Sequence, residues 1–273
     1  MKPMRSMRER VSEAEWELRV NLAACYRLVA KYGMTDLIYN HITARVPGPE
    51  HHILISAYGM LYEEVTASSL IKVDLAGNII EKPDHGYSVN AAGYIIHSAV
   101  HEAREDAQCV IHTHTPAGIS VSAMEEGLLP LSQTAMRFHG HVAYHEYEGP
   151  AFNRGEKGRL VAHLGKHNAM ILRNHGLLAC GPSIPQAFNM IYWLEQACHP
   201  GAAPLLPAAA APGEARGGGT DGRGAVRNGD HARQRSAHQS QHQGRRAEGG
   251  QRLRPARVAG SAALARARRS LVS

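Results

Sequence analysis

Residues 91–118, AAGYIIHSAVHEAREDAQCVIHTHTPAG, decide the fold of this chain. From position 91 to 105 apolar residues recur every three or four positions, which predicts a buried helix. Residues 108–115 form a short apolar run that carries two histidines and stops at Pro116, which predicts a buried strand that opens into a loop. A helix that leads directly into a buried strand is typical of a layered α/β domain.

The sequence on either side shows the same mixture of helical and strand patterns. Ser12 and Glu15 form a capping box before a periodic segment, so we expect a helix over 13–32 that ends at Gly33. A hairpin bend is expected at 76–78. The same criteria predict helices over 115–126, 156–164 and 185–198, and strands over 37–46, 52–57, 71–74, 79–80, 142–147, 168–173 and 177–180.

The composition of the 273 residues changes at position 199. Residues 199–273 hold 13 Arg, four acidic residues, no Lys and no aromatic residue, which gives this segment a net charge of +9. Because the whole chain carries a net charge of +6, residues 1–198 carry a net charge of −3. The first segment therefore gives no support to nucleic-acid binding. We predict a domain over 1–198 and a disordered tail over 199–273. The tail has two open explanations, a functional Arg-rich arm or the product of a frameshift in a GC-rich gene.

The cysteines and the N-terminus bear on the compartment. The four Cys, at positions 25, 109, 180 and 198, form no CxxC pair. We expect buried free thiols and a cytoplasmic protein. The basic residues 1–10 precede no apolar stretch, so a signal peptide is not expected. No run of about 18 apolar residues occurs, so we expect no membrane span.

Three histidines are candidate metal ligands. His112 and His114 lie two positions apart in the predicted strand, so their side chains leave the same face. His175 occupies a tight turn, 173–176, between two strand-like runs. Three neutral nitrogens with an open fourth position describe a catalytic zinc site, whose ion can polarise a carbonyl group. The alternative is a pair of satisfied core histidines, because the sequence alone does not bring His175 close.

A second pair, His97 and His101, lies four positions apart on the helix predicted over 91–105. Side chains at this spacing share a helix face and can share a metal ion. Without a Glu directly after the first His, however, the pattern is more typical of a polar helix edge.

Four segments resemble the class II aldolase/adducin family, and their sequences are most similar to its adducin-like branch. They are 36–45 (DLIYNHITAR), 58–70 (YGMLYEEVTASSL), 92–118, and 172–178 (LRNHGLL). The resemblance covers about residues 12–198. It implies a three-layer α/β/α fold with a mostly antiparallel central sheet, and a homo-oligomer, usually a tetramer, if the C-terminus permits. It also implies zinc or another divalent metal at His112, His114 and His175.

The sequence departs from the aldolases of this family at Ala91, Ala92 and Gly93. Those enzymes carry Ser-Ser-Glu there, which holds the substrate phosphate and moves a proton. Methyl groups and glycine do neither, so unaltered chemistry on a phosphorylated ketose is not expected. Asn40 and Gly59 lie where family members approach the phosphate and are candidate substrate-binding residues. Both could instead have a structural role, Asn40 as a turn residue and Gly59 as a residue with a positive φ angle.

His97 follows Gly93 by one helical turn and is the candidate catalytic acid/base, expected to face the three histidines and to titrate near neutrality. Tyr94 and Glu63 are lesser candidates.

Two classes of function follow. One is a metal-dependent lyase or isomerase acting on a small hydroxycarbonyl compound. The other is a non-enzymatic, adducin-like module that binds a cytoskeletal protein.

Overall fold

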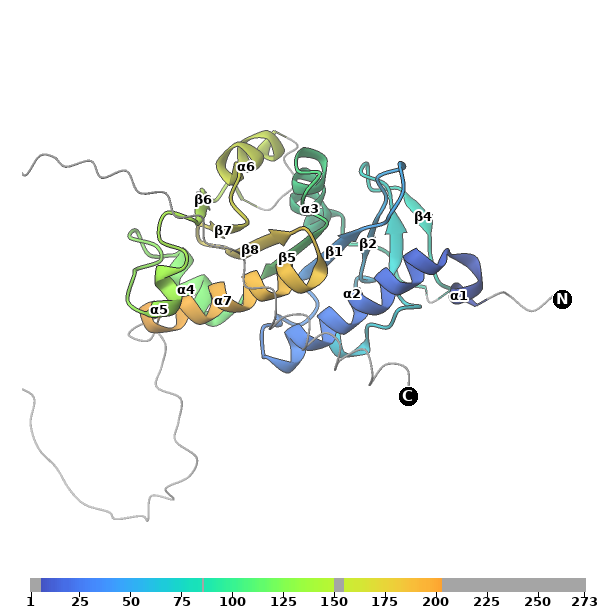
Figure 1. Cartoon of the computed structure of the whole chain (residues 1–273), viewed down its shortest axis with the longest axis horizontal. Helices are drawn as coiled ribbons and strands as arrows, with labels where there is room; N and C mark the ends of the chain where they lie inside the picture. Colours follow the sequence, from blue (N-terminus) through green and yellow to red (C-terminus); the bar gives the residue numbers. More distant parts are fainter. Residues whose placement is uncertain (1–5, 85, 150–154, 203–273) are drawn as a thin grey trace, which may run out of the picture. The chain divides into compact units, whose positions relative to one another are not determined.

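A computed structural model describes residues 6–84, 86–149 and 155–202 (Figure 1). The chain divides into two units, and these residues all belong to the one that spans Met1–Pro207. The second unit, Ala208–Pro255, lies outside the described residues. Most of the tail predicted over 199–273 therefore also lies outside them.

An eight-stranded sheet forms the centre of this unit, in the order β4-β3-β2-β1-β5-β8-β7-β6. Neighbouring strands are antiparallel except β6 and β7, which are parallel, so the sheet is mixed and mostly antiparallel, as predicted. The strands are β1 (His41–Arg45), β2 (Ile53–Ile55), β3 (Ile71–Val73), β4 (Ile79–Glu81), β5 (Cys109–Thr113), β6 (Ala143–His145), β7 (Ala169–Leu172) and β8 (Gly176–Gly181).

Helices cover both faces of the sheet. Figure 1 shows α2 and α7 along one face and α3 and α6 against the other, which gives the predicted three layers. The helices are α1 (Met7–Arg10), α2 (Glu13–Lys31), α3 (Ala91–Ala103), α4 (Pro116–Ser122), α5 (Gln133–Met136), α6 (Glu156–Leu164) and α7 (Ile184–Ala202), with a 3₁₀ turn η1 (Tyr62–Glu64).

Strand β5 is buried on both faces, which explains its nearly continuous apolar sequence. Cys109 and Ile111 pack with α2 and α7 in one core cluster. Val110 packs with α3 and α6 in another. Because side chains alternate along a strand, His112 leaves the sheet on the same face as Val110, towards α3 and α6.

At the N-terminus of α2, only one of the two hydrogen bonds of the predicted capping box forms. The Ser12 hydroxyl accepts a hydrogen bond from the Glu15 N–H at 3.2 Å, as expected. The Glu15 carboxylate instead accepts from Arg19 at 3.0 Å and from Lys72 at 2.8 Å. Arg19 is fully buried, so its guanidinium requires these partners more than the helix end requires a second cap.

Helix α7 extends beyond its predicted end at Cys198. It continues through Pro200 to Ala202, although proline offers no N–H to the preceding turn. Cys198 and Ala202 are both fully buried, so side-chain packing holds this last turn in place. Among the described residues, all four cysteines are buried free thiols and no helix is long and apolar enough to cross a membrane.

Candidate metal centre

The turn from β5 into α4 positions two of the three candidate histidines. His112 is the fourth residue of β5, and His114 follows the end of the strand. Thr115 then caps α4, and its hydroxyl accepts a hydrogen bond from the Gly118 N–H at 3.2 Å. The strand and the cap fix the backbone on both sides of His114, so both imidazoles are held by regular structure.

The turn between β7 and β8 positions the third. Asn174 adopts the left-handed conformation with φ of 53°, and the His175 N–H donates to the Leu172 carbonyl at 3.1 Å. Gly176 then allows β8 to approach β5 closely. A Cβ atom at that position would overlap the Thr113 carbonyl oxygen and lie 3.2 Å from the His114 ring.

The structure brings the three imidazoles together. The Nε2 atom of His112 lies 2.7 Å from that of His114 and 3.1 Å from that of His175. All three ligand atoms lie within 4.8 Å of one another. His112 is buried, whereas the other two rings are half-buried. A ligand could therefore reach the centre from the side of His114 and His175.

The hydrogen bonds of the remaining ring nitrogens fix the tautomers. His112 Nδ1 lies 2.8 Å from the Leu177 carbonyl oxygen, which only accepts, so the proton is on Nδ1. His114 Nδ1 lies 3.1 Å from an Asp36 carboxylate oxygen and donates to it in the same way. The Nε2 atoms of both rings are then left with lone pairs that face each other. Such a donor set fits a divalent cation, and a carboxylate behind a ligating histidine is the common support for one.

The protonation of the centre also suits a cation. Burial, followed by the charges of His114 and His145, lowers the pKa of His175 to about 4. Burial, with His175 and His114 next in effect, lowers the pKa of His112 well below its ordinary value. These two imidazoles are therefore neutral at neutral pH, which is the form that binds a metal ion.

His97 differs from its expected behaviour. It is fully buried, and its Nδ1 atom lies 2.9 Å from the Thr43 hydroxyl oxygen. Burial, with the neighbouring His41 and His101, lowers its pKa well below 6.5, so the prediction that it titrates near neutrality is wrong. His101 Nε2 lies 2.8 Å from the same hydroxyl oxygen. His97 and His101, the second candidate pair of metal ligands, therefore both contact Thr43.

The two candidate substrate-binding residues lie in different surroundings. Asn40 directly precedes β1 and is buried, and neither atom of its amide has a hydrogen-bond partner among the described residues. Gly59 lies between β2 and η1 with φ of +108°, and a Cβ there would lie 3.0 Å from the Tyr87 ring.

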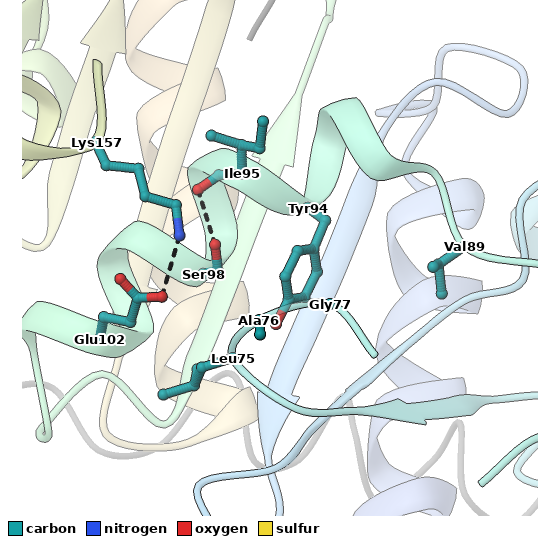
Figure 2. A pocket seen from close by; sticks show the side chains of 9 residues that line it. All are labelled: Leu75, Ala76, Gly77, Val89, Tyr94, Ile95, Ser98, Glu102 and Lys157. Atoms are coloured by element: carbon teal, nitrogen blue, oxygen red, sulfur yellow. Dashed lines mark hydrogen bonds and ion pairs between the residues drawn. The ribbon is translucent and has the colours of Figure 1, made fainter. Parts of the chain in front are cut away.

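The lesser acid/base candidates lie elsewhere. The Tyr94 hydroxyl donates to the Asp74 carbonyl, and Glu63 is exposed on η1. Tyr94 lines a cavity of about 440 Å³ between α3 and the β3–β4 turn (Figure 2). Figure 2 shows that Lys157 and Glu102 face each other across one side of this cavity, with their charged atoms 3.0 Å apart. None of the three histidines lines it.

Sequence reasoning missed two neighbours of the centre. Asp36 is separated from His114 by 78 positions, and no spacing rule relates them. The Tyr147 ring centroid lies 6.5 Å from that of His175, and Tyr147 is exposed at the end of β6. The only sequence feature that could have indicated Tyr147 is its place as the last residue of the strand predicted over 142–147, next to where a functional loop can begin.

The fold and the centre together define a layered α/β protein with a three-imidazole site of the kind that holds a divalent metal. The family profile described as "Class II Aldolase and Adducin N-terminal domain" matches residues 20–200. The chain therefore belongs to the class II aldolase and adducin family. The resemblance stated from the sequence is confirmed.

Relatives in this family include both enzymes and adducins. An aldolase II superfamily protein from Pseudomonas syringae has 54% identity and a TM-score of 0.72, over 74% of this chain and 81% of that one. L-fuculose 1-phosphate aldolase from Glaciozyma antarctica has 30% identity and a TM-score of 0.63, over 76% and 80%. Alpha-adducin of Rattus norvegicus is 50% identical over 66% of this chain, which spans only 25% of that protein.

Proposed function

We propose that this protein is a metal-dependent enzyme of the lyase or isomerase type that acts on a small hydroxycarbonyl compound. The observation that carries the proposal is the convergence of three Nε2 atoms, two of them with fixed lone pairs. The similarity to an L-fuculose 1-phosphate aldolase supports the reaction class. Ala91, Ala92 and Gly93 favour an unphosphorylated ligand, although their side chains lie outside the described residues.

His112, His114 and His175 would hold the ion. Three neutral nitrogens and no carboxylate or thiolate in the set favour zinc among divalent metals. A bound ion of this kind polarises a carbonyl oxygen as a Lewis acid. Asp36 keeps the His114 ring in the ligating tautomer, and the Leu177 carbonyl does the same for His112.

The other candidate residues receive separate roles. The unpartnered amide of Asn40 supports the binding of a polar group of the ligand. The positive φ of Gly59 supports a structural role at its turn. The complete burial of His97 and its bond to Thr43 support a positioning role between α3 and β1, in place of direct acid/base catalysis.

A homo-oligomer forms part of the proposal. Leu131 and Met136, near α5, expose 59% and 54% of their surface. Large apolar side chains left exposed in this segment support a subunit contact there. Sedimentation of the purified chain as a tetramer would support this arrangement, and a monomer at all concentrations would contradict it.

The experiment that tests the function is a turnover assay on a panel of small hydroxy-aldehydes and hydroxy-ketones. Cleavage, condensation or isomerisation that chelator abolishes and zinc restores would support the proposal. Turnover that is indifferent to chelator would contradict it. The His112→Ala variant provides the control, because it removes the buried ligand and should be inactive with or without added zinc.

The second candidate function is a non-enzymatic binding module. The 50% identity to alpha-adducin, higher than the 30% to the fuculose-phosphate enzyme, favours it. Cosedimentation of the protein with actin filaments would support this alternative. The same experiment with the His112→Ala variant would show whether such binding needs the three-histidine centre.

A further inference from the structure

We propose that Glu156 is the catalytic residue that accepts a proton from the ligand, and that His145 positions it. This inference rests on the proposed function and adds to it the general base that is missing at Gly93. It comes from a cluster of buried polar side chains on the α6 side of the centre, between β6, α6 and the β7–β8 turn.

A small cavity is lined by both Glu156 and one of the three histidines. Glu156, His145 and His175 all line it, and its volume is about 10 Å³. A volume of that size accommodates roughly one water molecule or one small polar group. The carboxylate and His175 thus border the same space, which admits one small group of a ligand and no further side chain.

Glu156 is buried with an incomplete set of partners. It is the first residue of α6 and only 5% exposed, and its Oε2 atom has no hydrogen-bond partner among the described residues. A buried carboxylate oxygen without a partner costs free energy unless a ligand or solvent satisfies it. The arrangement therefore leaves one carboxylate oxygen available at the cavity.

His145 lies beside the other carboxylate oxygen, and its Nε2 atom makes no hydrogen bond among the described residues. Its Nε2 atom lies 3.5 Å from Glu156 Oε1, and its Nδ1 atom lies 2.9 Å from His163 Nδ1. One proton is shared between the two Nδ1 atoms. If His163 donates it, His145 carries its own proton on Nε2, directed at the carboxylate. The opposite assignment would set a nitrogen lone pair against the negative charge, which is unfavourable at short range.

The two cations of α6 nearest in sequence to Glu156 donate their hydrogen bonds to other carboxylates. Arg159 donates to Glu148 at 2.7 Å, and Lys157 donates to Glu102 at 3.0 Å. His163 is exposed at the other end of the chain of imidazoles. The series His163, His145, Glu156 thus runs from solvent to the buried cavity and provides a route by which a proton can reach the site.

The proposed step is a proton transfer. The C–H bond next to the ligand carbonyl breaks, its electron pair stays on the ligand as an enolate, and the proton forms an O–H bond with Glu156 Oε2. Return of the proton to the same carbon reverses the step. In D₂O, exchange of the Glu156 proton with solvent replaces it with a deuteron before it returns to the carbon, so the ligand gains deuterium without any net reaction.

The test measures this exchange directly. The full-length, zinc-loaded protein is incubated in D₂O with dihydroxyacetone or hydroxyacetone, and loss of the C–H signal is followed by proton NMR. The Glu156→Gln variant should slow exchange by roughly 10²–10⁴-fold while it retains its zinc. Glu156→Asp should restore part of the rate. Glu126→Gln, an exposed residue after α4, is the matched control and should exchange at the wild-type rate.

The outcomes separate the two proposals. Exchange by the wild type that Glu156→Gln leaves within about threefold, with zinc and circular dichroism unchanged, overturns the role of Glu156 and leaves the proposed function standing. Absence of exchange in the wild type with both ketones contradicts the proposed function, and the role of Glu156 falls with it.

A second measurement needs no ligand. Nitrogen-15 chemical shifts of the imidazoles distinguish the two tautomers of neutral histidine. The wild type should show the His145 proton on Nε2, and Glu156→Gln should shift the population towards Nδ1. A wild-type His145 protonated on Nδ1 alone would overturn the positioning role. A purely structural function of Glu156 would not change this tautomer.

Discussion

The Nε2 atoms of His112 and His114 lie 2.7 Å apart, and each ring is locked through its other nitrogen. The hydrogen bond that fixes the His114 ring is accepted by Asp36, so this carboxylate should contribute to metal affinity without touching the ion. We expect Asp36→Asn to weaken zinc binding by roughly 10–100-fold, the usual effect of removing such a support. Competition with a chromogenic chelator measures it. Asp84→Asn, an exposed aspartate, should bind zinc as the wild type does, and equal affinities of all three proteins would contradict the prediction.

The close approach of β8 to β5 predicts that Gly176→Ala is destabilising. The added methyl group would overlap the Thr113 carbonyl oxygen, so the strands must separate beside two of the histidines. Overpacking of this kind costs about 1–3 kcal/mol of unfolding free energy. Denaturant unfolding measures the loss. Gly158→Ala is the control, because nothing lies within 4 Å of a Cβ there and the helix gains propensity. Equal stability of the two variants would argue against the close contact.

The buried histidines predict an acid-labile protein. Burial, with Arg45 next in effect, lowers the pKa of His101 to about 3, whereas an unfolded histidine titrates near 6.5. Because the folded pKa is the lower one, the unfolded state takes up the proton first. The stability from the neutral ring is complete above about pH 6.5 and is lost as the pH falls towards 3.

The predicted slope for His101 is up to about 1.4 kcal/mol per pH unit within that range. Urea unfolding at a series of pH values measures it on metal-free protein. His101→Gln should be less stable than the wild type at pH near 7.5, because the bonds to Thr43 and the Ala107 carbonyl are altered. Its stability should decline less steeply below about pH 6.5. Parallel curves for the two proteins would show that His101 does not cause the acid lability.

Sequence periodicity predicted most of this fold because the helices are amphipathic and the strands are short and apolar. The helix over 91–105 and the strand over 108–115 correspond to α3 and β5. The strand over 37–46 was too long, since Leu37 has φ of 48° and the strand starts at His41. Alternating hydrophobicity does not reveal such a backbone turn, because it depends on which face each residue packs against.

The candidate site was predictable only where the chain itself sets the geometry. The spacing of His112 and His114 places them on one face of a strand. His175 could be identified as a candidate because it lies in a tight turn between two predicted strands. The contribution of Asp36 depends on how β1 and β5 pair, and that of Glu156 on how α6 packs against β6, so neither follows from local sequence. The wrong expectation of a near-neutral pKa for His97 has the same origin, because helix periodicity gives its face but not its complete burial.

The most direct test of the account is the metal content of the purified protein. Elemental analysis should find one equivalent of a divalent metal, zinc first, per wild-type chain and per His139→Ala chain, whose altered residue is exposed. His114→Ala should lose nearly all of it while keeping its circular dichroism spectrum. A folded wild-type protein that binds no divalent metal even after incubation with excess zinc, or a His114→Ala variant that binds as much as the wild type, would contradict the assignment of the three histidines.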